Sequence, residues 1–304
     1  MSAEIKVGVC SWTEKTLLES GWYPAEANKD AESRLRYYAE HFPLVENDAT
    51  FYALPATKQA ELWAARTPDE FTMNVKAFAP LTTHHTDPKR LPRDLRDELP
   101  KELREKRRIY PKDLGDEALS EIAKRFRVAL EPLQAAGKLG AVLFQYPPWF
   151  AISRANKDEI VRAKELLPDF RLAIEFRNGT WMSERNRQET LSFLRDNDLV
   201  YVSVDEPQGF KTSIPPLAAA TSDVAMVRFH GRNAETWMKQ TQTAAERFKY
   251  EYTDEELTEW VPRIRSLAEE SDEVQVLYNN CYADFAVTNA KRMAELLKTK
   301  RKAS

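Results

Sequence analysis

Short apolar runs recur along the chain, and each becomes polar at its C-terminal end. Eight of them have this form: VGVCSW (7–12), LVENDATFY (44–52), FTMNVKAF (71–78), LGAVLFQYPP (139–148), LAIEFRNGTW (172–181), LVYVSVDEP (199–207), VAMVRFHGR (224–232) and VQVLYNN (274–280). Runs of this length, bounded by turn residues, are typical of buried strands. We therefore predict eight strands with reactive side chains gathered at one end of each.

Parity along these strands separates polar from apolar side chains, because successive strand residues point to opposite faces. In the fifth run Glu175 and Arg177 share one face, while Ile174 and Phe176 share the other. One face therefore suits a covering layer of helices, and the other suits a polar interior. A parallel barrel provides both environments, and its catalytic groups usually lie where the strands end.

The segments between the strands have helical periodicity, and strands that alternate with helices indicate a parallel sheet. We expect helices over residues 31–41, 57–66, 116–136, 154–166, 183–197, 254–270 and 284–299. Thr253 with Glu256 forms a capping box, and Ser183 is the expected N-cap of its helix. Since no linker rich in Gly, Ser or Pro interrupts this alternation, we predict a single (β/α)8 TIM barrel that spans residues 1–304.

Composition narrows the class of protein further. The 304 residues carry a formal net charge of −3, so the chain as a whole has no attraction for nucleic acid or acidic membranes. No apolar stretch approaches the roughly 20 residues needed to cross a bilayer, and the N-terminus lacks the features of a secretory signal. We expect a cytoplasmic protein without a membrane partner. The two cysteines, Cys10 and Cys281, are expected to be packing thiols.

Two connections are much longer than usual and form insertions after the third and seventh strands, over residues 79–115 and 231–252. Within the first, residues 89–112 hold ten Lys or Arg against five Asp or Glu. This stretch suits either capture of an anion or a solvated helix from about 93 to 108 with paired charges. Residues 232–252 interleave aromatic and cationic side chains, which stack bases in some proteins and pack a lid in others. The neighbouring His84 and His85 are not expected to share a metal ion.

Seven ordered motifs carry a family resemblance: VGVCSWTEKT with GWYP, VENDATFYALP, FTMNVKAF, LGAVLFQYPP, AIEFRNGTW, VRFHGR and YNNCYADFAVTNA. In this order, over residues 5–297, the chain resembles the YecE-like family, TIM-barrel proteins that form a domain of unknown function. The resemblance implies a complete barrel of the xylose-isomerase-like kind and no particular reaction. The chain departs from the family pattern at Asn47, where a β-branched residue is usual, and a polar side chain facing the helix layer is costly unless hydrogen-bonded.

Parity and position select the residues expected to point into the barrel mouth. The expected catalytic residues are Glu46, Lys76, Glu175, Asp205 and His230, and the expected substrate-binding residues are Trp12, Asp48, Gln145, Arg177, Arg228, Arg232 and Asn279. A carboxylate among these groups suits a general base, His230 suits exchange of a second proton, and the cations suit an anionic or polyhydroxylated ligand.

These parts fit best an enzyme that transfers a proton next to a carbonyl group, as a sugar isomerase or epimerase does, on a small substrate that is either phosphorylated or neutral. No cofactor is predicted. The resemblance to xylose-isomerase-like proteins raises one alternative, a single divalent cation held by Glu175, Asp205 and His230, although Arg177 and Arg228 would repel it. The competing function is a nucleic-acid-binding or nucleic-acid-processing module that uses residues 89–112 and 232–252. A purely structural alternative needs no ligand. In it Glu175, Arg177, Asp205 and Arg228 form a neutral network of paired charges that seals the barrel interior.

Overall fold

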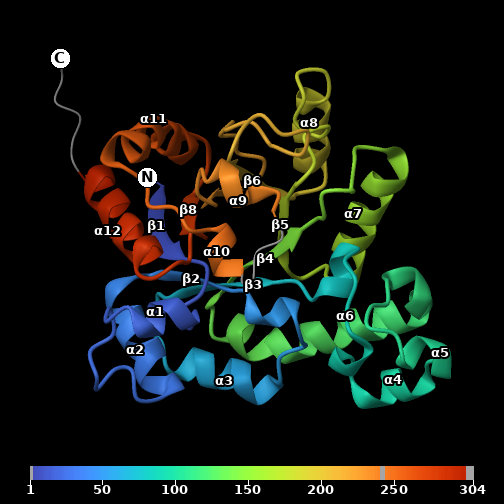
Figure 1. The fold of residues 1–304 in the computed structure, drawn as a ribbon. Coiled ribbons are helices and arrows are strands. Elements are labelled where there is room, and N and C mark those ends of the chain that lie inside the picture. The colour runs from blue at the N-terminus through green and yellow to red at the C-terminus, as the bar shows by residue number, and fades with distance from the viewer. Residues whose placement is uncertain (1–2, 240–243, 299–304) are drawn as a thin grey trace. The chain divides into compact units, whose positions relative to one another are not determined.

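The protein forms a closed barrel of eight parallel strands in the order β1 to β8, in a computed structural model that describes residues 3–239 and 244–298 (Figure 1). The predicted TIM-barrel fold is confirmed. The strands are β1 (Glu4–Val9), β2 (Leu44–Asn47), β3 (Thr72–Lys76), β4 (Leu139–Gln145), β5 (Arg171–Glu175), β6 (Val200–Asp205), β7 (Val224–Phe229) and β8 (Glu273–Tyr278). Half of the candidate residues lie within the strands, near their C-terminal ends: Glu46, Lys76, Gln145, Glu175, Asp205 and Arg228. The other half lie in the turns that follow: Trp12, Asp48, Arg177, His230, Arg232 and Asn279.

The longer helices follow the strands as expected. They are α2 (Ala31–His41), α3 (Thr57–Ala65), α6 (Pro111–Ala135), α7 (Arg154–Leu166), α8 (Arg187–Asp196), α11 (Asp254–Glu270) and α12 (Phe285–Lys298). Short helical segments lie between them: α1 (Lys15–Glu19), η1 (Ala49–Phe51), η2 (Ala79–Thr82), η3 (Pro88–Arg90), α4 (Arg93–Glu98), α5 (Lys101–Arg104), α9 (Ala234–Trp237) and α10 (Ala244–Arg247).

Three helices, α2, α7 and α11, match their predicted boundaries, and the structure corrects three other predicted helices. Helix α6 begins at Pro111, five residues before the predicted start. It is interrupted at Gly115, whose φ of 77° is a conformation that glycine adopts readily. Helix α8 begins at Arg187 after Asn186, so Ser183 is not its N-cap. The helix expected over 93–108 is two short helices, because Pro100 starts a new one. Residue 299 of the last predicted helix lies outside the described residues.

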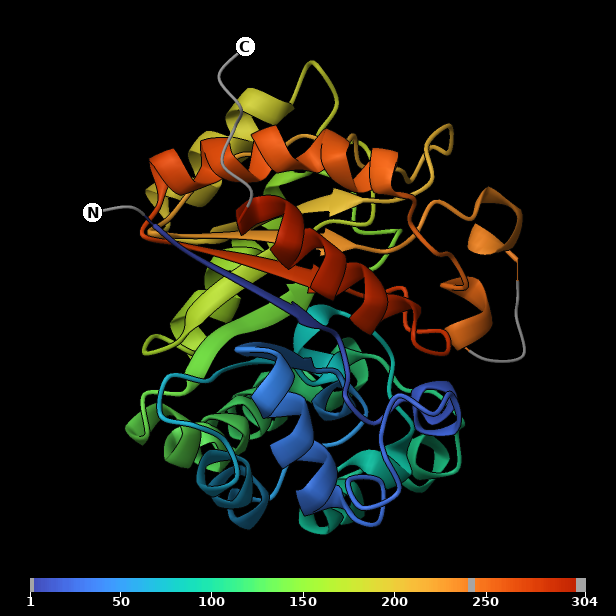
Figure 2. The same cartoon turned by 90° about the vertical axis from the view of Figure 1, so that its left-hand side faces the viewer.

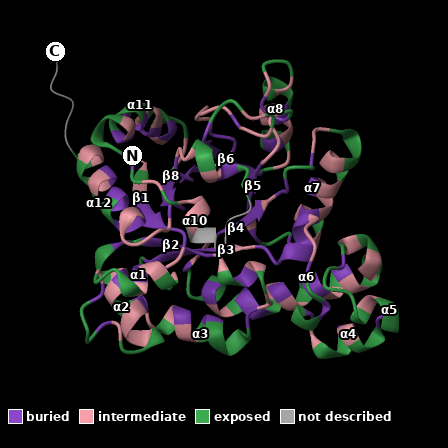
Figure 3. Cartoon of the chain, viewed as in Figure 1, coloured by how far each residue is buried: buried purple, intermediate pink, exposed green. Residues whose placement is uncertain are grey.

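The chain divides into two compact units, residues 1–46 with 179–304, and residues 47–178. In the first unit β6, β7, β8, β1 and β2 pair in that order. Helix α12 lies along β1, and α11 lies beside α12 (Figure 2). In the second unit β3, β4 and β5 pair in that order. The strands are buried and the helices carry the exposed positions (Figure 3), as expected for a parallel sheet whose outer face is covered. The prediction of a single domain stays a prediction.

A tyrosine closes the seam between β1 and β2. Gly8 lies opposite Leu44 and Val9 opposite Val45. The buried Tyr38 of α2 accepts a hydrogen bond from the Val9 N–H at 2.9 Å and donates one to the Leu44 carbonyl at 2.8 Å. A Cβ on Gly8 would lie only 1.9 Å from the Leu44 carbonyl oxygen, so glycine allows the strands to approach this closely.

Asparagine side chains repair two irregular points of the sheet in the second unit. The register between β3 and β4 shifts between Met73 and Val75, and the Asn74 amide oxygen accepts the hydrogen bond of the Ala141 N–H at 2.8 Å. At the end of β2, the Asn47 amide oxygen accepts from the Ala49 N–H at 3.1 Å. Its amide nitrogen, although buried, makes no hydrogen bond among the described residues. The departure from the family pattern at Asn47 is therefore only half satisfied.

Candidate functional site

The inner face of the first unit carries a fully buried ion pair. Strand register places Arg228 of β7 beside Leu277 of β8. Leu277 in turn lies beside Gly8 of β1, and Gly8 lies beside Leu44 of β2, so these four residues share one face of the sheet. Arg228 donates a hydrogen bond of 2.5 Å to Glu46, and both side chains are completely buried. The same guanidinium lies 3.5 Å from the Cys10 sulfur. Because breaking one partner of a buried pair leaves an uncompensated charge, this contact fixes the arrangement of β1, β2 and β7.

His230 follows Arg228 on the same face and is enclosed by neighbours. The Asn279 amide lies 3.0 Å from its Nδ1. The rings of Trp237 and Phe248 lie 6.2 and 6.1 Å from the imidazole, and these two rings pack edge to face. The described part of the segment 232–252 therefore packs as a lid over His230. Residues 240–243 of that segment lie outside the described residues.

Asp205 corrects the parity argument, because it points toward the helix layer instead of the barrel interior. Register pairs Asp205 with Phe229 and Val204 with Arg228, so Asp205 and Arg228 lie on opposite faces. The Asp205 carboxylate accepts hydrogen bonds from Trp260 at 2.7 Å and Tyr252 at 2.8 Å.

The expected ligand-binding residue Arg232 is the third partner of this carboxylate. It holds both oxygens, at 2.9 and 2.8 Å. Burial raises the pKa of the Tyr252 phenol, as does the Asp205 charge, so the phenol remains a donor. Both carboxylate oxygens of Asp205 accept hydrogen bonds from neighbouring side chains. Asp205 is therefore better suited to holding α11 in place than to acting as a catalytic base.

Trp12 lies just beyond β1 and is buried. Its carbonyl accepts a hydrogen bond of 2.8 Å from Tyr23. The preceding Ser11 has φ of 128°, a conformation that residues with a side chain rarely adopt. Strained backbone of this kind is concentrated at functional sites, and here it sets the direction in which the chain leaves β1.

Three candidate residues share one face in the second unit. Register pairs Lys76 with Leu143 and Gln145 with Glu175, so Lys76, Gln145 and Glu175 point the same way at the ends of β3, β4 and β5. The fully buried Glu175 accepts a hydrogen bond of 2.7 Å from the Gln145 amide, and Arg177 lies 3.4 Å away. These donors suit a carboxylate rather than a carboxylic acid.

Lys76, on the same face, has one distant ion-pair partner. Its side chain is 13% exposed, and its nearest carboxylate oxygen is Asp48 Oδ1, at 3.9 Å. The ammonium also lies over the Phe51 ring, 4.8 Å from the centroid. No hydrogen bond holds it within residues 3–239 and 244–298.

Sequence reasoning missed the third group of this region, His84. Its ring packs against Phe51 at 5.1 Å and Trp149 at 5.9 Å, and Thr82 lies 2.9 Å from its Nδ1. Burial and the Lys76 charge lower the pKa of His84 to about 4, so the imidazole is neutral at pH 7. His85 points elsewhere, against Tyr110. The position of His84 just after β3 was the available signal.

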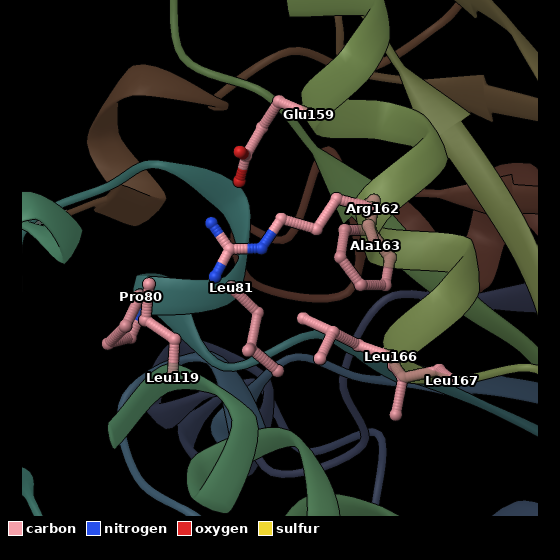
Figure 4. A pocket seen from close by; sticks show the side chains of 9 residues that line it. Pro80, Leu81, Leu119, Glu159, Arg162, Ala163, Leu166 and Leu167 are labelled. Atoms are coloured by element: carbon pink, nitrogen blue, oxygen red, sulfur yellow. The ribbon is translucent and has the colours of Figure 1, made fainter. Parts of the chain in front are cut away.

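A small cavity beside α7 does not suit a substrate. Leu81, Leu166 and other apolar side chains line it, with Glu159 and Arg162 pointing toward one another at its rim (Figure 4). Its volume of about 10 Å³ holds roughly one water molecule. Burial raises the pKa of Glu159, partly offset by the Arg162 charge. Its lining comes from η2, α6, β4 and α7, so the cavity is a small gap in side-chain packing.

The residues of the alternative cation site do not fit a metal ion. Asp205 faces away from Arg228 and binds N–H and O–H donors with both oxygens. A metal ion needs the same lone pairs. Across the described residues no group of three or more His, Cys, Asp or Glu side chains is placed to hold a metal.

The insertion that contains residues 89–112 packs against α6, where Arg125 donates a hydrogen bond of 2.8 Å to Asp94. Thr86 and Ile109 exchange backbone hydrogen bonds of 2.9 Å and close its base. Within it Arg93 and Arg96 lie within 3.5 Å of Asp97, as expected for interleaved charges on a solvated surface. In the described part of the chain no helix is both long and apolar enough to cross a bilayer.

Comparison with known proteins identifies the family. Residues 6–304 match the family described as "Protein of unknown function DUF72". The chain belongs to the DUF72 family. The UPF0759 protein YunF of Bacillus subtilis (strain 168) is 33% identical to it over 297 residues, which cover 96% of this chain and 94% of YunF. The resemblance to YecE-like proteins is thereby confirmed.

Solved DUF72 structures share the fold. A DUF72 family protein from Enterococcus faecalis superposes with a TM-score of 0.77 at 25% identity, covering 98% of this chain and 97% of the other. One from Thermotoga maritima gives a TM-score of 0.77 at 27% identity, with coverage of 97% and 100%. For this DUF72 chain the comparisons establish family and architecture, and the roles of its site residues stay predictions.

Proposed function

We propose that this DUF72 protein is an enzyme that binds a polar anionic or sugar-like small molecule at the strand ends and transfers a proton next to its carbonyl group. The Lys76 ammonium carries the proposal. Only 13% of the Lys76 side chain is exposed, and its ammonium makes no hydrogen bond among the described residues. An ammonium has three donors and is costly to desolvate without acceptors. A substrate oxygen would supply what it lacks.

The neighbouring groups support proton transfer. Glu175 lies on the face of Lys76 and serves as the base that takes the proton from the carbon beside the carbonyl. The electron pair of that C–H bond moves to the carbonyl oxygen, and Lys76 stabilises the negative oxygen that forms. The protonated Glu175 then returns that proton to the neighbouring carbon, while the neutral imidazole of His84 gives its N–H proton to the first substrate oxygen and takes the hydroxyl proton of the second.

The test is solvent-isotope exchange. Aldoses, ketoses and their phosphates are incubated with the protein in deuterium oxide, and proton NMR measures loss of the C–H signal next to the carbonyl. Lys76→Met should slow exchange by about 100- to 1,000-fold, as removal of an oxyanion donor does. Glu175→Gln should slow it by about 100-fold or more. Lys58→Met, at an exposed lysine paired with Glu61, is the matched control and should exchange at the wild-type rate.

Two results would contradict the proposal. One is the absence of exchange on every carbonyl compound in the panel. The other is exchange that Lys76→Met and Lys58→Met leave equally unchanged.

Nucleic-acid binding through the insertion makes a different prediction. Affinity would fall steeply with salt, with a log–log slope near −0.9 for each phosphate neutralised on duplex DNA. The combined change of Arg104, Arg107 and Arg108 to Ala would then abolish binding, whereas under the enzyme hypothesis it leaves proton exchange intact.

A further inference from the structure

Four aromatic side chains of the second unit form a continuous strip at the strand ends. The aromatic strip consists of Tyr52, Phe51, His84 and Trp149, in that order. Successive ring centroids lie 5.3, 5.1 and 5.9 Å apart. Its members follow β2, β3 and β4, and the Thr50 hydroxyl donates to the Lys76 carbonyl at 2.6 Å, which ties the first segment to β3. Three loops therefore build one surface.

Both ends of the aromatic strip are open to solvent. Tyr52 is 60% exposed and Trp149 is 59% exposed, among the most exposed large hydrophobic side chains of the described residues. A single exposed aromatic residue needs no explanation, but aromatic residues joined into a patch mark a binding surface.

Beneath the aromatic strip lie an ammonium and a carboxylate oxygen that form a long ion pair with each other but no hydrogen bond. Lys76 lies over the Phe51 ring and makes no hydrogen bond among the described residues. Asp48 Oδ1 is buried and likewise accepts no hydrogen bond within the described part of the chain. The two atoms lie 3.9 Å apart. Hydrogen bonds of about 2.8 Å to each would place one bridging oxygen at the apex of roughly a right angle.

The chemistry of that bridge selects a hydroxyl group. A hydroxyl both donates and accepts, so it donates to Asp48 while it accepts from Lys76. A phosphate oxygen has no proton to give at neutral pH, and the Asp48 carboxylate would repel it. A ring that carries hydroxyl groups on its edge and C–H groups on its face matches the polar pair and the aromatic strip together.

We propose that the aromatic strip binds the ring of a neutral carbohydrate, which stacks on Trp149 or Tyr52 and bridges Lys76 and Asp48 with a hydroxyl. This inference deepens the function proposed above, since it rests on the same Lys76 and chooses neutral sugars over phosphorylated ones. The two exposed rings at opposite ends favour a saccharide of more than one unit over a monosaccharide.

Binding is measured by isothermal titration calorimetry on the full chain. The ligands are neutral di- and trisaccharides of glucose, mannose, xylose and N-acetylglucosamine, with glucose 6-phosphate and adenosine as competing classes. At least one neutral saccharide should bind, and Trp149→Ala should weaken it by about 5- to 100-fold, the loss typical of one stacking aromatic. Trp149→Phe should retain most of the affinity.

Tyr110→Ala is the matched control, because Tyr110 is exposed in the same unit but lies outside the aromatic strip, against His85. It should bind as the wild type does. Asp48→Asn tests the bridge and should weaken the neutral saccharide while improving glucose 6-phosphate. Urea unfolding of each variant verifies that it is folded.

Failure of this inference is distinguishable from failure of the proposed proton transfer. Saccharide binding that depends on Trp149, without C–H exchange, would retain the carbohydrate site and remove the enzyme. Exchange on a carbonyl compound, with saccharide affinity equal in Trp149→Ala and the wild type, would do the reverse. Tighter binding of glucose 6-phosphate or adenosine, or no saccharide binding at all, would overturn the inference.

Discussion

Protonation of His84 should weaken the fold in mildly acidic solution. Its imidazole packs between Phe51 and Trp149, and burial together with the Lys76 ammonium lowers its pKa from 6.5 to about 4. In the unfolded chain the imidazole keeps its ordinary pKa. Between these two values the unfolded state binds more protons than the folded state, so stability decreases as the pH falls.

The magnitude follows from the shift. A difference from 6.5 to about 4, at 1.36 kcal/mol for each unit, corresponds to about 3 kcal/mol. The full contribution to stability is present above pH 6.5, declines as the pH falls toward 4, and is absent below that value. Such a loss is a large part of the roughly 5–15 kcal/mol that stabilises a typical domain.

Urea unfolding of the wild type and His84→Phe at a series of pH values from 7 to 4 measures the effect. Phenylalanine keeps an aromatic ring but does not titrate, so the difference between the two proteins isolates His84 from carboxylates that titrate in both. That difference should change by about 3 kcal/mol across the series. Lys76→Met should raise the pKa of His84, as followed by NMR of the imidazole protons. An imidazole that titrates near 6.5 in the wild type, or a pH-independent difference, would refute this reasoning.

Three further predictions concern the first unit. Arg228→Met should cost about 3–5 kcal/mol, because it leaves Glu46 charged and buried; in urea unfolding the double variant with Glu46→Gln should be less destabilised than the sum of the single changes, and additive losses would refute a direct pair. Gly8→Ala should cost about 3 kcal/mol or more, since its methyl group would meet a carbonyl oxygen at 1.9 Å; an unchanged unfolding midpoint would show that the strands can separate without cost. A thiol reagent should label Cys281 in the folded protein and Cys10, which is 2% exposed, only after unfolding; equal labelling rates would contradict the burial of Cys10.

The barrel was predictable because its signal is local. Each strand is a short apolar run and each long helix has its own periodicity, so α2, α7 and α11 match their predicted boundaries to the residue. The capping box of Thr253 and Glu256 forms as predicted, because its partners are three residues apart.

The site was less predictable because its contacts are not local. Parity separates the two faces of β6 but does not say which of them is the inner one. The register with β7 decides it, because it places Asp205 beside Phe229, where Trp260, 55 residues away, supplies an indole N–H. His84 lay in a segment with no periodicity, and only the fold brings it between Phe51 and Trp149. Conversely, Lys76, Gln145 and Glu175 share a face as expected, because strand parity alone determines it.

The tyrosine at the first seam has a consequence for the order of assembly. The Tyr38 hydroxyl joins the Val9 amide to the Leu44 carbonyl. Main-chain hydrogen bonds alone therefore do not complete the pairing of β1 with β2. Helix α2 must dock before, or together with, the closing of the strand pair. Tyr38→Phe should therefore slow folding more than it speeds unfolding, a signature of a contact already made in the transition state.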